Sequence, residues 1–129
     1  MKVFCISDDL MMTGKIASIA RNMQIPCRIF ANVSDLERRL KSPEGETQQD
    51  FGGEKTLWLI DLQRNQEDWP RVRELAQLMD PPAQIVGYAQ HVLPHLIEEA
   101  QLAGFDRVLT RGKFDRQVAS LIEEFAAHA

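Results

Sequence analysis

The chain has 129 residues, the length of one ordinary domain, and 44% of them are hydrophobic, enough to bury a single core. Its formal net charge of −4 argues against direct binding to nucleic acid, because phosphate contacts need a clustered basic surface. No apolar run approaches the length of a membrane span and no signal-peptide pattern opens the chain, so we expect one domain, residues 1–129, located in the cytoplasm.

Apolar runs typical of buried strands alternate with stretches of helical period along the chain. The first predicted strand is 1–6, and the helix after it is indicated by apolar residues at helical spacing: Met12, Ile16, Ile19, Ala20 and Met23. The second predicted strand is 25–33. Ser34 is followed three residues later by Glu37, which predicts a capping box at the start of a short second helix.

The middle of the chain contains an unusually long polar connection. Residues 41–55 are rich in turn formers, and we expect them to form a flexible loop. The third predicted strand is 56–60, and a third helix follows Asp68, which we expect to cap it. Pro81 and Pro82 then end this helix.

Two further strand and helix pairs complete the pattern. The fourth predicted strand is 84–89, followed by a helix that begins at Pro94 and has Gly104 as its C-cap. The fifth is 107–110, and Asp115 is predicted to cap a last helix whose apolar face consists of Val118, Leu121, Ile122 and Phe125.

Five units of this kind predict an α/β fold, a three-layer αβα sandwich around a five-stranded parallel sheet ordered 2-1-3-4-5, as in flavodoxin-like proteins. Such sheets bind ligands at the carboxyl ends of the strands where the order reverses, here between the first and third strands. Asp8 and Asp9 follow the first of these, and Asp61 follows the third. Clustered carboxylates attract a divalent cation. An alternative role for Asp8 or Asp9 is to cap the first helix.

The residues Ser7-Asp8-Asp9 and Ile60-Asp61 make most of the chain resemble the receiver domains of response regulators. This resemblance implies that Asp61 is the phosphoacceptor, which takes a phosphoryl group from a histidine kinase or a small phosphodonor. It also implies a Mg²⁺ ion held by Asp8, Asp9, Asp61 and the main-chain carbonyl of Gln63. The protein would then be a signalling module rather than an enzyme with a substrate of its own, with autophosphorylation at Asp61 as its only chemistry.

Other positions depart from the receiver pattern. Tyr88, followed by Ala89, stands where receivers have Ser or Thr, and Thr110 stands where they have Lys, followed by Arg111 in place of Pro. These four residues and Lys113 are the candidates for phosphoryl contact. The mixture is also similar to atypical or pseudo-receiver domains, which keep the fold and signal through protein contacts.

Partners follow from the same resemblance. A histidine kinase or another signalling protein is expected, with an effector bound by the fourth predicted helix, the fifth strand and the fifth helix, and a homodimer is compatible with this arrangement. A flavodoxin-like ligand-binding protein or enzyme is the alternative from another class, although Asp8 and Asp9 would repel a flavin phosphate. A purely structural interaction module remains a third alternative.

Overall fold

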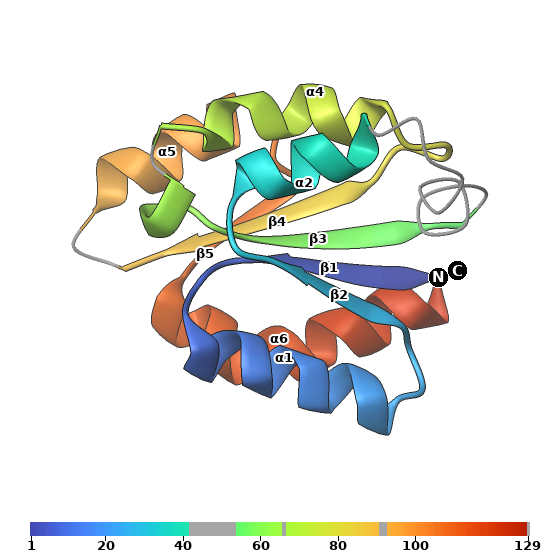
Figure 1. The fold of residues 1–129 in the computed structure, drawn as a ribbon. Helices are drawn as coiled ribbons and strands as arrows, with labels where there is room; N and C mark the ends of the chain where they lie inside the picture. Colours follow the sequence, from blue (N-terminus) through green and yellow to red (C-terminus); the bar gives the residue numbers. More distant parts are fainter. Residues whose placement is uncertain (42–53, 66, 91–92, 129) are drawn as a thin grey trace.

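The computed structural model describes residues 1–41, 54–65, 67–90 and 93–128. Five parallel strands form one sheet in the order β2-β1-β3-β4-β5 (Figure 1). The strands are β1 Lys2–Ile6, β2 Cys27–Phe30, β3 Thr56–Asp61, β4 Gln84–Ala89 and β5 Arg107–Thr110. The α-helices of the described residues are α1 Leu10–Asn22, α2 Val33–Leu40, α4 Val72–Gln77, α5 Pro94–Leu102 and α6 Arg111–Ala127. The predicted sheet order and three-layer architecture are confirmed.

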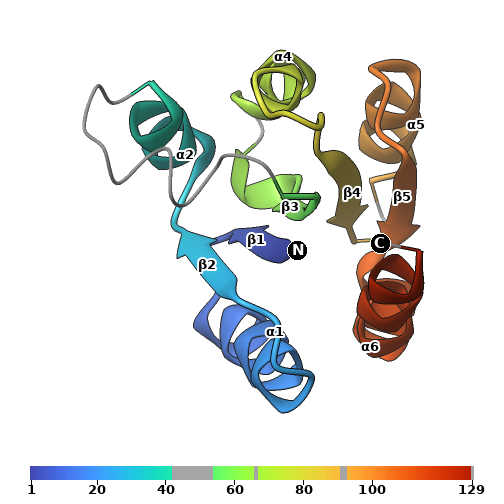
Figure 2. The ribbon, with the colours of Figure 1, turned by 90° about the vertical axis from the view of Figure 1, so that its right-hand side faces the viewer.

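The helices form one layer on each face of the sheet. Helices α1 and α6 cover one face, and α2, α4 and α5 cover the other (Figure 2). Alternate residues of β3 enter the two cores, with Leu57 and Leu59 facing α1 and α6, and Trp58 and Ile60 in the opposite cluster. Because both faces of β3 are covered, this strand is a continuous apolar run rather than an alternating one.

Helix α2 begins two residues earlier than the capping box predicted, at Val33 instead of Asp35. The Asn32 side chain accepts a hydrogen bond from the Asp35 N–H at 2.9 Å and is the N-cap. Ser34 lies inside the helix, so the predicted capping box of Ser34 and Glu37 is wrong. Strand β2 is also shorter than predicted, since it ends at Phe30 and leaves room for this cap.

Helix α6 starts directly after β5 rather than at Asp115. Thr110, the last residue of β5, is the N-cap, and its Oγ1 accepts a hydrogen bond from the Lys113 N–H at 3.3 Å. The predicted cap at Asp115 is therefore wrong. Asp115 lies within the helix and pairs with Lys15 of α1, with 2.8 Å between Nζ and Oδ1. The pair joins the two helices of this layer.

The third predicted helix is reached through a short 3-10 helix, Trp69–Arg71. Asp68 makes no side-chain capping hydrogen bond, and α4 starts only at Val72, so the predicted cap at Asp68 is wrong. The C-cap of α5 is Ala103, one residue before the predicted Gly104. Gly104 follows it with a φ of +95°, a left-handed backbone that favours glycine directly after a helix.

Residues 42–53, most of the stretch predicted as a flexible loop, lie outside the described residues. Across the described part of the chain, no helix has both the length and the apolar character needed to cross a bilayer.

Candidate functional site

The carboxyl edge of the sheet brings Ser7, Asp9 and Asp61 together. Asp61 is the last residue of β3 and is only 2% exposed, and Ser7 directly follows β1 and is buried. The Ser7 hydroxyl donates a hydrogen bond to Asp61 Oδ2 and accepts one from the Asp9 N–H, both at 3.0 Å. One hydroxyl therefore links the ends of β1 and β3 to the start of α1.

Both oxygens of the Asp9 carboxylate are engaged within the chain. Oδ1 accepts hydrogen bonds from the N–H groups of Met11 at 3.1 Å and Met12 at 3.4 Å, so Asp9 caps α1. Oδ2 accepts a hydrogen bond from the guanidinium of Arg111, the first residue of α6. This bond from Arg111 is the main cause that lowers the pKa of Asp9 below its ordinary value.

Asp8 has an arginine partner of its own. Arg64 lies in a short 3-10 helix, Gln63–Asn65, directly after β3, and its Nη1 is 2.7 Å from Asp8 Oδ1. Both side chains are about half exposed, so the pair is weak in energy. The Arg64 main-chain N–H also donates to Asp61 Oδ1 at 3.3 Å, which places this turn directly over the Asp61 carboxylate.

The surroundings of Asp61 favour its neutral form. Burial raises the pKa of Asp61 above its ordinary value, and the hydrogen bonds from Ser7 and the Arg64 N–H oppose this effect without cancelling it. Buried Asn65 donates hydrogen bonds from Nδ2 to the main-chain oxygens of Asp61 at 2.8 Å and Ile6 at 3.3 Å. Its Oδ1 accepts a hydrogen bond from the Val33 N–H at 3.1 Å, so Asn65 fixes β1, β3 and α2 around the site.

The phosphoryl-contact candidates on β4 are core residues. Tyr88 is buried, and its ring stacks on Phe114 of α6, with 4.0 Å between ring centroids and 13° between planes. Its hydroxyl has no hydrogen-bond partner among the described residues, and burial is the main cause that raises the pKa of Tyr88. Ala89 is also buried, opposite Thr110 in the sheet register.

The remaining candidates have structural contacts. The Thr110 hydroxyl caps α6 by bonding the Lys113 N–H, and the Lys113 residue is exposed. The side chain of Gln63, the residue predicted to offer its carbonyl to a metal ion, accepts a hydrogen bond from the Gln90 N–H at 2.9 Å. Gln63 thereby connects the turn after β3 to the end of β4.

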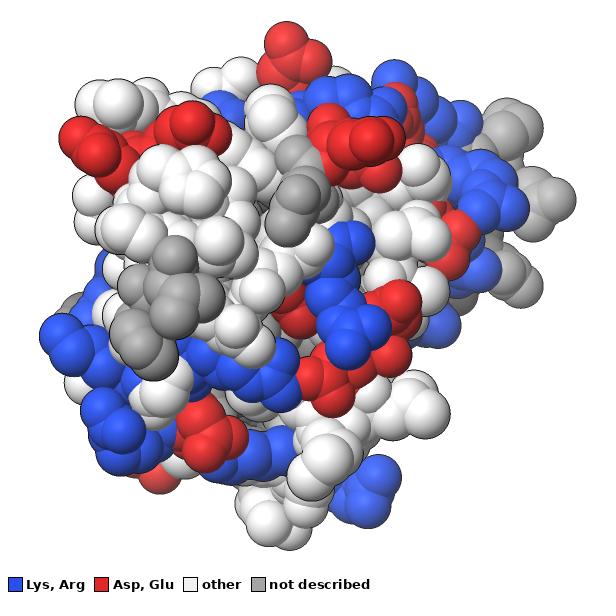
Figure 3. Space-filling view, turned by 90° about the vertical axis from the view of Figure 1, so that its left-hand side faces the viewer, with Lys and Arg blue, Asp and Glu red and all other residues white. Residues whose placement is uncertain are grey.

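The three carboxylates predicted as metal ligands, those of Asp8, Asp9 and Asp61, reach one edge, but they do not form an open cluster. Within residues 1–41, 54–65, 67–90 and 93–128, no group of three or more His, Cys, Asp or Glu side chains is arranged to hold a metal ion. Asp8 and Asp9 each pair with an arginine, and Asp61 lies buried beneath them. Figure 3, which views this edge of the molecule, shows acidic and basic side chains intermixed at its centre.

Sequence reasoning missed Ser7, Arg64 and Asn65 as parts of this site. Ser7 stands directly before the acidic pair, so its hydroxyl was placed to reach the same edge. Arg64 and Asn65 follow Asp61 by three and four residues, the spacing at which a single helical turn returns toward its start. That spacing was the available signal.

No protein-family model and no curated protein sequence matches the chain. Among solved structures, the chain is similar to the receiver domain of NtrX from Brucella abortus, with a TM-score of 0.67 and 15% identity over 99% of each chain. It is also similar to the beryllofluoride-activated NtrC4 receiver domain dimer, solved in solution, with a TM-score of 0.66 and 13% identity over 96% of this chain and 98% of that chain. At these identities the likeness concerns the fold. The chain therefore has the fold of response-regulator receiver domains.

Proposed function

We propose that this chain is a receiver-type signalling module that acts by binding partner proteins, with arginines in place of a metal ion at its acidic edge. The observation that carries this proposal is the pairing of Asp8 with Arg64 and of Asp9 with Arg111. A guanidinium keeps its charge at any physiological pH, so Arg64 and Arg111 offset the charges of Asp8 and Asp9 across that range. A Mg²⁺ ion would have to displace them to reach the carboxylates.

The positions that would sense a phosphoryl group support the same proposal. Tyr88 fills the core against Phe114, and the Thr110 hydroxyl caps α6. Neither is a short hydroxyl or an ammonium available to follow a change at Asp61. A module that signals by contact needs no such sensing groups.

Exposed apolar side chains beside the site support a protein partner. Leu10 and Met11, the first two residues of α1, are 83% and 86% exposed and lie next to the acidic edge. Leu102 of α5 is equally exposed, which agrees with an effector on α5, β5 and α6. The partners we propose are a histidine kinase or another signalling protein, with a homodimer as the alternative assembly. The free thiols Cys5 and Cys27 support a location in the reducing cytoplasm.

Phosphorylation of Asp61 is the second candidate function, favoured by the arrival of three carboxylates at one edge. The pair of Asp8 and Arg64 is exposed and therefore inexpensive to exchange. In this case Mg²⁺ would be held by the carboxylates of Asp8, Asp9 and Asp61 and by the Gln63 carbonyl, and it would offset negative charge at the phosphoacceptor. Ser7 and the Arg64 N–H would orient the Asp61 carboxylate.

Amide NMR spectra of labelled protein during addition of Mg²⁺, followed by beryllofluoride, separate the two functions. We expect the wild type to show no shifts localised at Asp8, Asp9 and Asp61. A variant carrying both Arg64→Gln and Arg111→Gln should gain such shifts, because its carboxylates lose their guanidinium partners. Arg116→Gln, on the exposed surface of α6, is the control for a general change in charge.

The opposite result would establish the second candidate. In that case Mg²⁺ would shift wild-type resonances at the three aspartates, and beryllofluoride would extend the shifts toward Tyr88 and Arg111. Asp61→Asn would abolish both effects. These results would identify a working phosphoreceiver and overturn the proposal that arginines replace the metal ion.

A further inference from the structure

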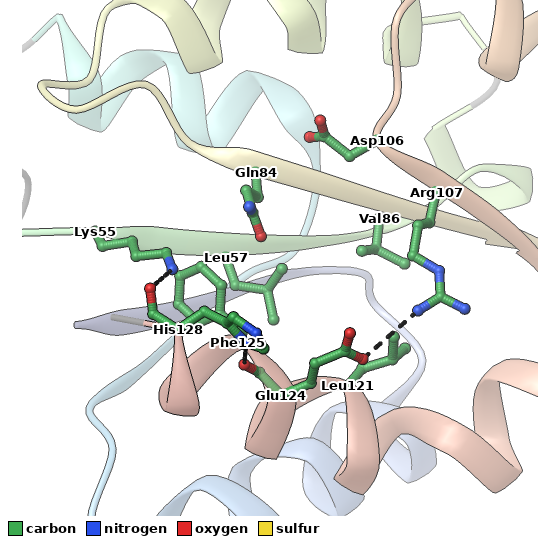
Figure 4. A pocket seen from close by; sticks show the side chains of 10 residues that line it. All are labelled: Lys55, Leu57, Gln84, Val86, Asp106, Arg107, Leu121, Glu124, Phe125 and His128. Atoms are coloured by element: carbon green, nitrogen blue, oxygen red, sulfur yellow. Dashed lines mark hydrogen bonds and ion pairs between the residues drawn. The ribbon is translucent and has the colours of Figure 1, made fainter.

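A cavity of ≈ 260 Å³ opens at the amino edge of the sheet, opposite the edge that carries Asp61. Gln84 and Arg107 are the first residues of β4 and β5, and Lys55 directly precedes β3. These residues line the side of the cavity formed by the sheet, and the C-terminal half of α6 lines the opposite side (Figure 4). None of these residues takes part in the contacts around Asp61, so the cavity is a separate feature of the molecule.

The floor of the cavity is apolar and is built from β3, β4 and α6, in the core between the sheet and helices α1 and α6. Leu57 and Val86 come from the sheet, and Leu121 and Phe125 come from α6. Each is at most 7% exposed, so the floor is fixed by packing on its other side. The cavity opens to solvent, and its volume of ≈ 260 Å³ is a little below the roughly 300–1,000 Å³ of typical ligand pockets, so it suits a ligand no larger than one ring with a substituent.

The rim carries three groups with N–H donors. The Arg107 guanidinium lies 4.0 Å from Glu124 Oε2, beyond hydrogen-bond distance. The Gln84 side chain is directed toward the cavity from the sheet (Figure 4). On the far side, Lys55 Nζ donates to the His128 main-chain oxygen at 2.9 Å and lies 4.5 Å from the Phe125 ring centroid. These donors surround an apolar floor.

Two carboxylates on the same rim limit the charge that a ligand can carry. Glu124 has a side chain that is 65% exposed, and Asp106 is held at the edge by the Ile85 N–H, which donates to its Oδ2 at 2.7 Å. Lys55 and Arg107 balance these two charges. These four charges sum to zero, so a phosphate dianion would meet both carboxylates, and a single negative charge is favoured only where it lies beside Arg107.

We propose that this cavity binds a small organic carboxylate with a flat apolar body. The body fills the space above Leu57, Val86 and Phe125, and binding mainly removes the ligand's own apolar surface from water, because these three side chains are at most 5% exposed. The carboxylate accepts hydrogen bonds from the Arg107 guanidinium, whose planar fork matches two carboxylate oxygens, and from the Gln84 amide. This binding is independent of the function proposed for the acidic edge.

Benzoate is the probe for this proposal, and benzamide, its neutral counterpart of the same shape, is the comparison. In amide NMR titrations of the full chain, benzoate should shift resonances of Leu57, Val86 and Phe125 and leave those around Asp61 unchanged. Benzamide should bind at the same residues about tenfold more weakly, because it lacks the charge that pairs with Arg107.

Three single variants assign the contacts. Arg107→Gln should weaken benzoate binding about tenfold and leave benzamide binding unchanged. Glu124→Gln should strengthen benzoate binding, since it removes the competing carboxylate, and Arg116→Gln should have no effect because Arg116 lies outside the cavity. The proposal is overturned if neither probe shifts the floor residues, or if benzoate binding is insensitive to Arg107→Gln.

Discussion

The protonation of Asp61 depends on the fold, because the folded chain buries its carboxyl group. Burial raises its pKa above the ordinary value of 3.8, so the folded protein favours the neutral carboxyl more than the unfolded chain does. The stability that this group contributes is fully present below about pH 3.8 and is lost as the pH rises through the folded pKa. At neutral pH, Asp61 therefore lowers the free energy of unfolding.

Asp61→Asn should be more stable than the wild type at neutral pH, because the amide stays uncharged. Its advantage should shrink as the pH falls toward 3.8, by about 1.4 kcal/mol for each unit by which the folded pKa is raised. Urea denaturation at a series of pH values measures this difference. Asp115→Asn, which removes an exposed carboxylate paired with Lys15, is the control and should be no more stable than the wild type at neutral pH, because it loses an ion pair. Parallel stability curves for wild type and Asp61→Asn would contradict the effect of burial.

At the scale of single elements, the start of α2 tests which side chain caps the helix. Asn32→Ala removes the hydrogen bond to the Asp35 N–H and should lower the free energy of unfolding by about 1 kcal/mol. Ser34→Ala should change it by less than about 0.5 kcal/mol, since Ser34 is exposed within the helix. Equilibrium denaturation measures the free energy of unfolding of both variants and shows which side chain caps the helix. A larger loss for Ser34→Ala would reinstate the capping box with Glu37.

Strand β4 is packed so closely at Gly87 that a side chain cannot be added without movement. A Cβ there would lie 2.8 Å and 2.9 Å from atoms of the Phe105 ring and 3.3 Å from Leu62. The ring is itself held edge-on against Trp69, with 5.8 Å between centroids, so it cannot move aside freely. This contact ties β4 to the residues that precede β5.

Gly87→Ala should therefore destabilise the protein by about 1–3 kcal/mol through overpacking. Gly14→Ala is the matched substitution, because a Cβ at Gly14 meets nothing within 4 Å and this glycine lies inside α1. It should stabilise the protein by about 0.5–1 kcal/mol. Thermal denaturation compares the two. If both substitutions changed the stability by the same amount and in the same direction, crowding around Gly87 would not be the cause of the effect at that position.

For the whole molecule, the sheet order predicts a gradient of local stability. All six residues of β3 are buried, whereas the edge strand β2 has two exposed residues among four and β5 has no fully buried residue. Edge strands have one neighbour in the sheet and fewer apolar contacts, so they open without global unfolding.

Amide hydrogen exchange by NMR should therefore show two classes of ladder amide. Those of β1, β3 and β4 should exchange only through global unfolding, and those of β2 and β5 should exchange at least about tenfold faster. The measurement is repeated at low denaturant concentrations, where only the slow class should become sensitive to denaturant. Protection of β5 equal to that of β3 would contradict a gradient set by the sheet order.

The sequence by itself determined the architecture of this protein. Strand-length apolar runs and helical spacing are encoded within a few residues, and the handedness of parallel crossovers then restricts the sheet order. The same reasoning placed Asp8, Asp9 and Asp61 at one edge. The caps were less predictable because Ser34 and Asp115 have suitable local spacing, while Asn32 and Thr110 lie where the preceding strand actually ends.

Only the tertiary structure decided the partners of the acidic residues. Arg64 and Asp8 are 56 residues apart in the chain, and Arg111 and Asp9 are 102 residues apart. No local pattern encodes such pairs, because they form only when β1, β3 and β5 are aligned in one sheet and their carboxyl ends meet. The balance of charge at this edge therefore depends on contacts between residues that are far apart in the sequence.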